Sequence, residues 1–216
     1  AFNNWSLNES VGYEGFFYDE FGYDYWSSVS RSEWENYVRD VVRYARNLNK
    51  RIFANAWFFG RDILDYNEKG NPILNFPDDL VLSENVFVFD NTRQLYYRLH
   101  YTNAFIKKGY PICGVFTLDF AGFPIKNGFV DLTDDISRKV EDYYRIANFL
   151  NFHSFGVVQQ DYGASVSRII TPPVLKVNYS QGYASFKNRG NYIIFKRDGY
   201  ELQTDMSLNI LKEIQT

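Results

Sequence analysis

Acidic side chains come directly after three short apolar runs of the sequence. The runs and the acids that follow them are 15–18 with Asp19 and Glu20, 80–83 with Glu84, and 112–118 with Asp119. In an α/β barrel the residues after the carboxyl end of a strand border the substrate cleft, so acids placed there are candidates for chemistry. Hydrolysis of a glycosidic bond needs one carboxylic acid as proton donor and a second carboxylate as nucleophile or base. The pattern therefore predicts a carbohydrate-cleaving site.

The adjacent acids Asp19 and Glu20 cannot simply divide these two tasks. Neighbouring residues of an extended strand point to opposite faces, so both reach one cleft only at a bulge or in the turn that ends the strand. Gly22 allows such a turn. We expect one of the pair and Glu84 to act as acid and counter-carboxylate, while the other member orients substrate or shifts a pKa by like-charge proximity. The alternative for Glu20 is an ion pair with an arginine inside the barrel wall.

Polar and aromatic residues near the acids are the candidates for holding a sugar. Asn55 ends another apolar run and is suited either to donate to a sugar hydroxyl or a carboxylate, or to form a turn. Trp57 and Tyr23 offer flat rings that either stack on the C–H face of a pyranose or pack in the core. Asp119 either binds a hydroxyl or caps its loop, and Asp24 either contacts substrate or only holds its loop.

Alternating strand and helix patterns must position these residues. A helix is predicted from a capping box of Ser32 and Glu35, because apolar residues recur at 3.6-residue spacing over 34–48. Its predicted polar face consists of Arg39, Asp40, Arg43 and Arg46. Other predicted elements are strands over 15–18, 51–57, 80–83, 112–118 and 155–159, helices over 92–108 and 136–150, and loops over 58–79 and 119–131. Strand, helix and strand in this order imply a right-handed parallel crossover.

The sequence pattern changes at about residue 165, where short runs typical of β-strands begin, separated by glycine-containing turns. We expect residues 1–164 to form the barrel portion and residues 165–216 to form a β-rich tail. A closed barrel has eight strand–helix units and typically about 250 residues, whereas about five units are visible in this chain. The predicted fold is therefore α/β, a TIM-type (β/α) barrel incomplete at its amino-terminal end, with a C-terminal antiparallel β appendage. We expect a preceding segment or another chain to complete the barrel.

The succession of strand ends resembles the spherulin-4-like proteins and the related family 114 glycosidase-like barrels. The matching features are the run Gly15-Phe16-Phe17-Tyr18-Asp19-Glu20, an amphipathic helix with Tyr37 and Val38, a strand that ends in Asn55 and a strand that ends at Glu84. The resemblance covers roughly residues 11–119. It implies a (β/α)8 barrel that hydrolyses glycosidic bonds, for example in galactosamine-containing polysaccharides, with Asp19, Glu20 and Glu84 in the site. The family's first strands are missing and the loop over 58–79 differs, so substrate preference does not transfer.

Composition argues against several other classes of protein. The net charge is −3 and the 23% charged residues are of mixed sign, which predicts neither nucleic acid nor anionic lipid as a partner. No apolar stretch approaches the roughly 20 residues of a membrane span, and no signal peptide opens the chain. His100 and His153 lack metal-ligand spacing, and no phosphate-binding or dinucleotide motif occurs, so neither a metal nor a cofactor is expected.

A lone cysteine and three glycosylation sequons bear on the compartment. Cys113 excludes an internal disulfide framework and, inside an apolar run, is expected to be a buried inert thiol. The sequons at Asn4, Asn8 and Asn178 favour a secreted or cell-surface protein. The predicted function is metal-independent hydrolysis of a polysaccharide by carboxylate acid/base catalysis. The alternative is a non-catalytic carbohydrate-binding or assembly subunit of a larger surface complex or filament, which the incomplete barrel and the 19% aromatic content favour.

Overall fold

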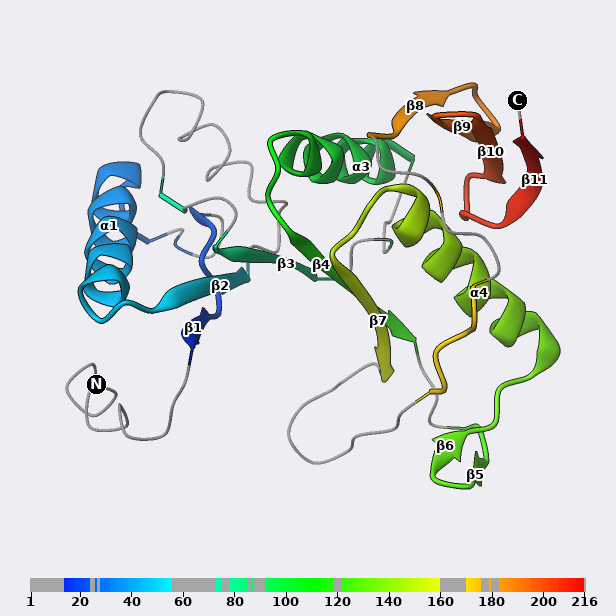
Figure 1. Cartoon of the computed structure of the whole chain (residues 1–216), viewed down its shortest axis with the longest axis horizontal. Helices are drawn as coiled ribbons and strands as arrows, with labels where there is room; N and C mark the ends of the chain where they lie inside the picture. Colours follow the sequence, from blue (N-terminus) through cyan, green and yellow to red (C-terminus); the bar gives the residue numbers. More distant parts are fainter. Residues whose placement is uncertain are drawn as a thin grey trace. The chain divides into compact units, whose positions relative to one another are not determined.

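The fold is given by a computed structural model of the chain (Figure 1). It describes residues 14–23, 26, 28–55, 73–74, 78–84, 87, 92–118, 122–159, 170–175, 179 and 183–215. The elements are β1 Gly15–Tyr18, α1 Arg31–Asn47, β2 Arg51–Asn55, β3 Leu80–Glu84, α3 Thr92–Lys107, β4 Ile112–Leu118, β5 Ile125–Lys126, β6 Phe129–Val130, α4 Asp134–Phe149, β7 Ser154–Gln159, β8 Ser185–Asn188, β9 Tyr192–Arg197, β10 Tyr200–Asp205 and β11 Ile210–Gln215.

The architecture is mixed α/β. One sheet has the strand order β1-β2-β3-β4-β7, a second, antiparallel sheet has the order β11-β10-β9-β8, and β5 and β6 form a small hairpin. Only three helices are present in the described part of the chain, so a complete barrel is not shown. The α/β class, the parallel sheet and the antiparallel tail are therefore confirmed. No described helix is long and apolar enough to cross a bilayer.

The chain divides after Leu82 into two compact units, 1–82 and 83–216. The first contains a strand–helix–strand crossover. Strands β1 and β2 pair in parallel, with Tyr18 opposite Ala54, and β2 pairs in parallel with the start of β3. Gly15 is required by this pairing, because a Cβ atom there would lie 2.7 Å from the Arg51 carbonyl oxygen. The parallel crossover is thus confirmed.

Helix α1 begins two residues earlier than the sequence analysis predicts. Its N-cap is Ser30, whose Oγ accepts from the Glu33 backbone N–H at 3.3 Å, while the Glu33 carboxylate accepts from the Ser30 N–H at 2.8 Å. Glu35 instead pairs with Arg31, one turn away, at 3.3 Å. The Ser-x-x-Glu pattern occurs twice in a row, and the prediction of Ser32 as the cap was wrong. With Ser30 as the N-cap, Trp34 lies one turn into the helix and is buried.

Arg46 is also placed differently from the prediction. It lies in the last turn of α1 and forms an ion pair with Asp79, a fully buried residue just before β3. The other Asp79 oxygen, Oδ1, accepts from the Ile52 N–H at 2.8 Å. An arginine side chain is long enough for its alkyl part to pack against apolar surface while its guanidinium pairs with a buried carboxylate. This ion pair joins α1, β2 and β3 at the amino ends of the strands.

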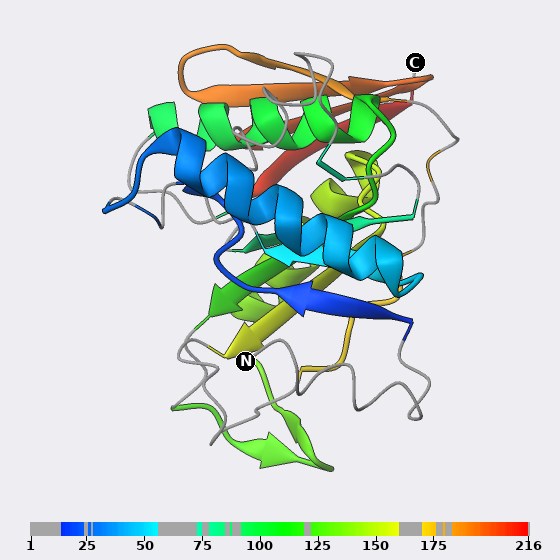
Figure 2. The same ribbon diagram turned by 90° about the vertical axis from the view of Figure 1, so that its left-hand side faces the viewer.

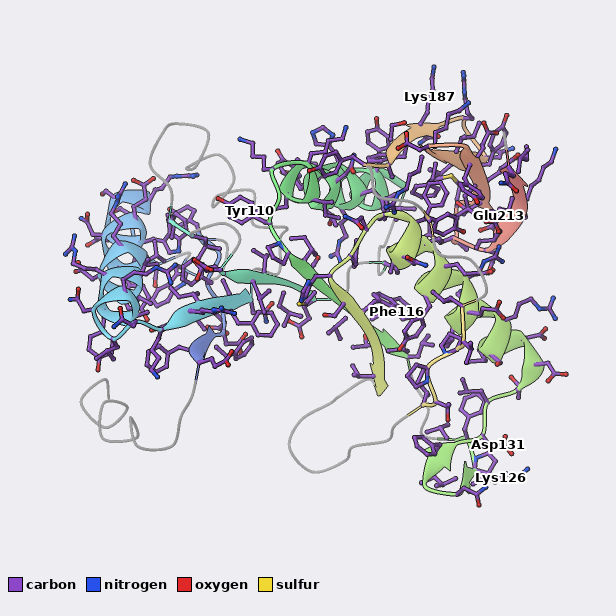
Figure 3. All side chains as sticks on the ribbon, in the orientation of Figure 1. Tyr110, Phe116, Lys126, Asp131, Lys187 and Glu213 are labelled. Atoms are coloured by element: carbon purple, nitrogen blue, oxygen red, sulfur yellow. The ribbon has the colours of Figure 1, made fainter. Side chains whose placement is uncertain are left out.

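The second unit is built around β4 and β7, which pair in parallel with Gly114 opposite Phe155. Aromatic rings fill the space beside these strands, and the rings of Phe87 and Phe116 lie 5.5 and 4.4 Å from that of Tyr143 on α4. Figure 3 shows Phe116 among these rings. Cys113 is buried in β4, as predicted, and burial raises the pKa of its thiol.

The antiparallel sheet packs against the helices of the second unit. Figure 2 shows β8 to β11 lying over α3, and the Tyr96 and Phe186 rings meet at 5.4 Å. On α4, Asp142 accepts from the Ile210 N–H at 2.9 Å. Glu213 accepts from Tyr179 at 2.8 Å and also pairs with Arg145 (Figure 3). The domain border expected between residues 164 and 165 stays a prediction.

Candidate functional site

The candidate site begins where β1 ends. Asp19 directly follows the strand and is exposed, and its Oδ1 accepts from the Asn55 side-chain amide at 2.8 Å and from the Glu20 N–H at 3.0 Å. Asn55 is the last residue of β2 and only 4% exposed. Because Tyr18 lies opposite Ala54, the register brings the next residues of the two strands side by side. The strand pairing thus brings together two of the residues predicted from sequence.

The two hydrogen bonds fix the orientation of the Asp19 carboxylate. Both donors act on Oδ1, and Oδ2 has no hydrogen-bond donor among the residues that the structure describes. The residue as a whole is exposed. An oriented carboxylate with one oxygen not engaged by a described donor is suited to accept a hydrogen bond from a sugar hydroxyl, or to act as nucleophile or base.

Glu20 occupies the turn that the sequence analysis required. Its φ of 51° lies in the left-handed region, which a glutamate adopts only when its surroundings impose it. Two hydrogen bonds hold the turn: the Phe21 N–H donates to the Asn55 carbonyl at 2.8 Å, and the Trp26 indole donates to the Glu20 carbonyl at 3.0 Å. The Glu20 side chain is exposed and forms no ion pair with any described residue. The arrangement therefore does not favour the alternative of a buried ion pair.

Tyr23 takes part in the packing of the same turn. Its hydroxyl donates to the Val29 carbonyl at 3.2 Å, and its ring lies 5.7 Å from that of Trp34. The Arg31 guanidinium lies 5.7 Å from the Tyr23 ring centre, on the first turn of α1. The residue is half-buried, so its ring is largely used within the fold. Trp57, Asp24 and Asp119 lie outside the described residues, and their roles stay predictions.

Two tryptophans that sequence analysis did not assign to the site support it. Trp34 is buried on α1, and its indole N–H donates to the Phe21 carbonyl at 3.1 Å. Trp26 donates to the Glu20 carbonyl and packs its ring 5.0 Å from that of Tyr37. The tryptophans themselves were the signal in the sequence. A buried indole N–H normally finds an acceptor, and the backbone carbonyls of a nearby turn supply one. The turn after β1 is thus tied to α1 as well as to β2.

The phenol that precedes Asp19 stays protonated at neutral pH. Tyr18 is half-buried at the end of β1, and burial, with smaller contributions from Tyr37 and Tyr44, raises its pKa to about 12. Its hydroxyl is therefore neutral, and the groups that act on it, Tyr37 and Tyr44, belong to α1. No group of three metal-binding side chains occurs among the described residues.

Glu84 is the last residue of β3 and is half-buried. It belongs to the second unit, together with the buried Ser83 that precedes it. Its position at the carboxyl end of a strand agrees with the predicted element, since the strand was expected over 80–83 and ends one residue later. The assignment of Glu84 as the second carboxylate stays a prediction from the sequence.

Comparison with known protein families and with curated proteins finds no match for this chain.

Proposed function

We propose that the chain is a glycoside hydrolase-like protein that acts on a polysaccharide, with Asp19 as one of its two working carboxylates. The observation that carries the proposal is the fixed side chain of the exposed residue Asp19, held through Oδ1 by Asn55 and the Glu20 N–H, while no described residue donates to its Oδ2. The motif likeness to the spherulin-4-like and family 114 barrels adds support. It also supports the finer fold proposal, in which the parallel sheet is part of a (β/α) barrel.

The proposed chemistry assigns Asp19 the role of counter-carboxylate or base. Both donors engage Oδ1 as an acceptor, so Oδ2, which no described residue engages, is the atom proposed to meet the sugar or the attacking water. Glu20 is exposed beside it and is proposed to orient the substrate. The second carboxylate that the reaction needs is the one predicted from sequence, Glu84, and with Asp19 as counter-carboxylate or base we propose Glu84 as the proton donor.

Sugar release from a panel of polysaccharides tests the proposal. We expect the parent protein to release reducing ends from at least one member, and Asp19→Asn and Glu84→Gln to lose about 10²- to 10⁴-fold of that rate. Asp40→Asn is the matched control, because Asp40 is an exposed aspartate of the same unit whose ion-pair partner among the described residues is Arg43, at 2.9 Å. Circular dichroism checks that each variant is folded. No release by the parent from any polysaccharide, or full activity of Asp19→Asn, would contradict hydrolysis.

A second candidate function is assembly without catalysis. Phe17 on β1 is 46% exposed, and its ring packs 5.4 Å from that of Phe53 on the neighbouring strand. Strand β1 is the first in the sheet order, so the phenylalanine pair marks an apolar part of a sheet edge in the described structure. Exposed apolar surface of this kind is often covered by a partner chain. Sedimentation of the parent and of Phe17→Ser tests it: a concentration-dependent oligomer that the substitution abolishes favours assembly.

A further inference from the structure

Two neighbouring hollows of the second unit share Tyr183 as a wall. One, of about 390 Å³, lies at the amino ends of β4 and β7 and includes Tyr110, Asn151 and His153. The other, of about 320 Å³, lies along the β9–β10 hairpin and includes Lys196 and Glu201. Figure 3 shows Tyr110 at the turn between α3 and β4. We call the two hollows together the Tyr183 groove. Its volumes are at the lower end of those that hold small ligands.

The side chain of Tyr183 is the exposed aromatic surface of the groove. It is 54% exposed, whereas Tyr110 is buried and Tyr200, in the second hollow, is half-buried. A half-exposed tyrosine ring in a concave site offers an apolar face for stacking and a hydroxyl for hydrogen bonding. A ligand with flat apolar faces and polar edges matches such a ring.

Polar groups on both sides of the ring are held by the fold. Lys196 and Glu201 lie opposite each other in the β9–β10 register and pair at 2.7 Å. On the other side, Arg197 donates to the Asn148 and Phe149 carbonyls at 3.0 and 2.9 Å, and its other terminal nitrogen lies 3.5 Å from the Asn151 side-chain oxygen. Asn151 is exposed, and no described residue accepts a hydrogen bond from its side-chain nitrogen. The groove thus contains both donors and acceptors.

The charges that line the groove cancel. The second hollow carries two cations, Lys196 and Arg197, and two anions, Asp198 and Glu201. Among the described residues that line the first hollow, the titratable side chains are those of His153 and two tyrosines. A site for a phosphate, a sulfated chain or a nucleic acid carries an excess of positive charge, and a site for a cation carries the reverse. The balance favours an uncharged ligand rich in groups that both donate and accept.

From these features we propose that the Tyr183 groove binds a neutral oligosaccharide. Sugar hydroxyls both donate and accept, as the mixed lining requires, and a pyranose C–H face stacks on Tyr183. The groove lies at the amino ends of β4 and β7 in the second unit, whereas Asp19 follows the carboxyl end of β1 in the first. The proposal therefore goes beyond hydrolysis and holds whether or not Asp19 is catalytic.

Binding to the full 216-residue chain tests the proposal. Short linear oligomers of glucose, galactose and N-acetylglucosamine are titrated into the labelled protein, and amide shifts and calorimetric affinities are recorded. We expect the shifts to centre on Asn151, Tyr183 and Lys196. Tyr183→Ala is expected to weaken binding about tenfold and Tyr183→Phe much less, because the stacking face is kept. Phe129→Ala is the matched control, since Phe129 is an exposed aromatic residue of the same unit that lines neither hollow.

The outcomes separate this proposal from the proposed function. Chemical-shift changes of the groove amides that persist in Asp19→Asn and disappear in Tyr183→Ala support oligosaccharide binding in the groove, even if no polysaccharide is hydrolysed. If no neutral oligomer shifts the groove amides, or if Tyr183→Ala binds as the parent does, the proposal is overturned. Groove binding only of sulfated galactose oligomers, or only of an uncharged peptide, overturns it as well, because the ligand class would then be different.

Discussion

Gly114→Ala is expected to destabilise the protein through a clash with an aromatic ring. Gly114 is buried in β4, and a Cβ atom there would lie 2.5 Å from one carbon of the Phe152 ring and 2.9 Å from one carbon of the Phe155 ring. The Phe152 ring is stacked 6.1 Å from that of Phe87, which is almost fully buried, so moving it disturbs its neighbours. Overpacking of this kind costs about 1–3 kcal/mol of unfolding free energy.

Part of that cost is offset in the unfolded chain. Replacing glycine by alanine removes unfolded-state entropy, which stabilises the native state by about 0.4–1 kcal/mol when the native backbone accepts the side chain. The expected net loss for Gly114→Ala is therefore at most about 2.6 kcal/mol, with a midpoint of about 1.3 kcal/mol. Urea denaturation followed by circular dichroism measures it as a lower midpoint at unchanged slope, since all four tryptophans lie in the other unit.

Gly156→Ala on the neighbouring strand β7 is the matched control. Gly156 lies opposite Val115, one residue along from Gly114, and a Cβ atom there has open space around it. Both substitutions change the unfolded chain alike, so the difference between them isolates the ring clash. We expect Gly156→Ala to be neutral or slightly stabilising, and Phe152→Leu to relieve part of the Gly114→Ala loss. Equal midpoints for the two glycine variants would refute the packing argument.

The other predictions concern buried and capping carboxylates. Asp79→Asn is expected to cost about 3 kcal/mol in urea denaturation, because it leaves the Arg46 charge without its buried partner. Hydrogen bonds with Ser30 lower the pKa of Glu33. The stabilising contribution of Glu33 is therefore present above the ordinary pKa of 4.5 and is lost as the pH falls. Glu33→Gln should accordingly flatten the fall of Tm in acid. Burial raises the pKa of Asp142, so ionising this carboxyl in the folded protein costs stability. Asp142→Asn should therefore raise Tm at neutral pH and leave it unchanged in acid.

Elements with a strong local signal were predictable from sequence. The apolar stripe of α1 specified the helix because Trp34, Val38, Val41 and Ala45 recur at helical spacing, and all four are buried. Helix α3 ends at Lys107, one residue before the predicted end, and Gly109 follows with a φ of 88°, which favours glycine. The start of α1 was mispredicted because two overlapping capping boxes are equivalent by composition. Only the packing of the finished helix distinguishes them.

The hairpin β5–β6 was hidden inside a segment predicted as a loop. Its strands have two residues each, too few for a β-type run to be recognised. The turn residues carried the available signal, since Asn127 and Gly128 both have positive φ, as an Asn-Gly hairpin turn requires. Figure 3 shows Lys126 and Asp131 at this hairpin, and the Asp131 N–H donates to the Pro124 carbonyl at 2.8 Å.

At the candidate site, residue types were predictable but their bonds were not. Asp19 and Asn55 were both predictable as site residues, because each lies at the carboxyl end of a predicted strand and parallel strands end at one edge of the sheet. Which of the two acids Asn55 would engage depends on register, and a shift of one residue would have placed Glu20 beside it. The left-handed φ of Glu20 depends in turn on Trp26 and Phe21, which lie along the chain beyond the strand. Such contacts follow from the folded turn and have no pattern of their own in the sequence.

The polar ties between α4 and the tail carry the strongest argument against treating the tail as a loose appendage. Arg197 on β9 is buried, and it donates to the last carbonyls of α4, Asn148 and Phe149, where the helix dipole favours a cation. The same side chain approaches Asn151 in the Tyr183 groove. A substitution such as Arg197→Met would therefore loosen the helix end and the groove together, whereas Lys187→Met, on the exposed side of β8, would alter neither. If the groove amides kept their parent shifts in Arg197→Met, the groove would not depend on this arginine, and the tail would be held by its other contacts with α4, such as those of Asp142 and Arg145.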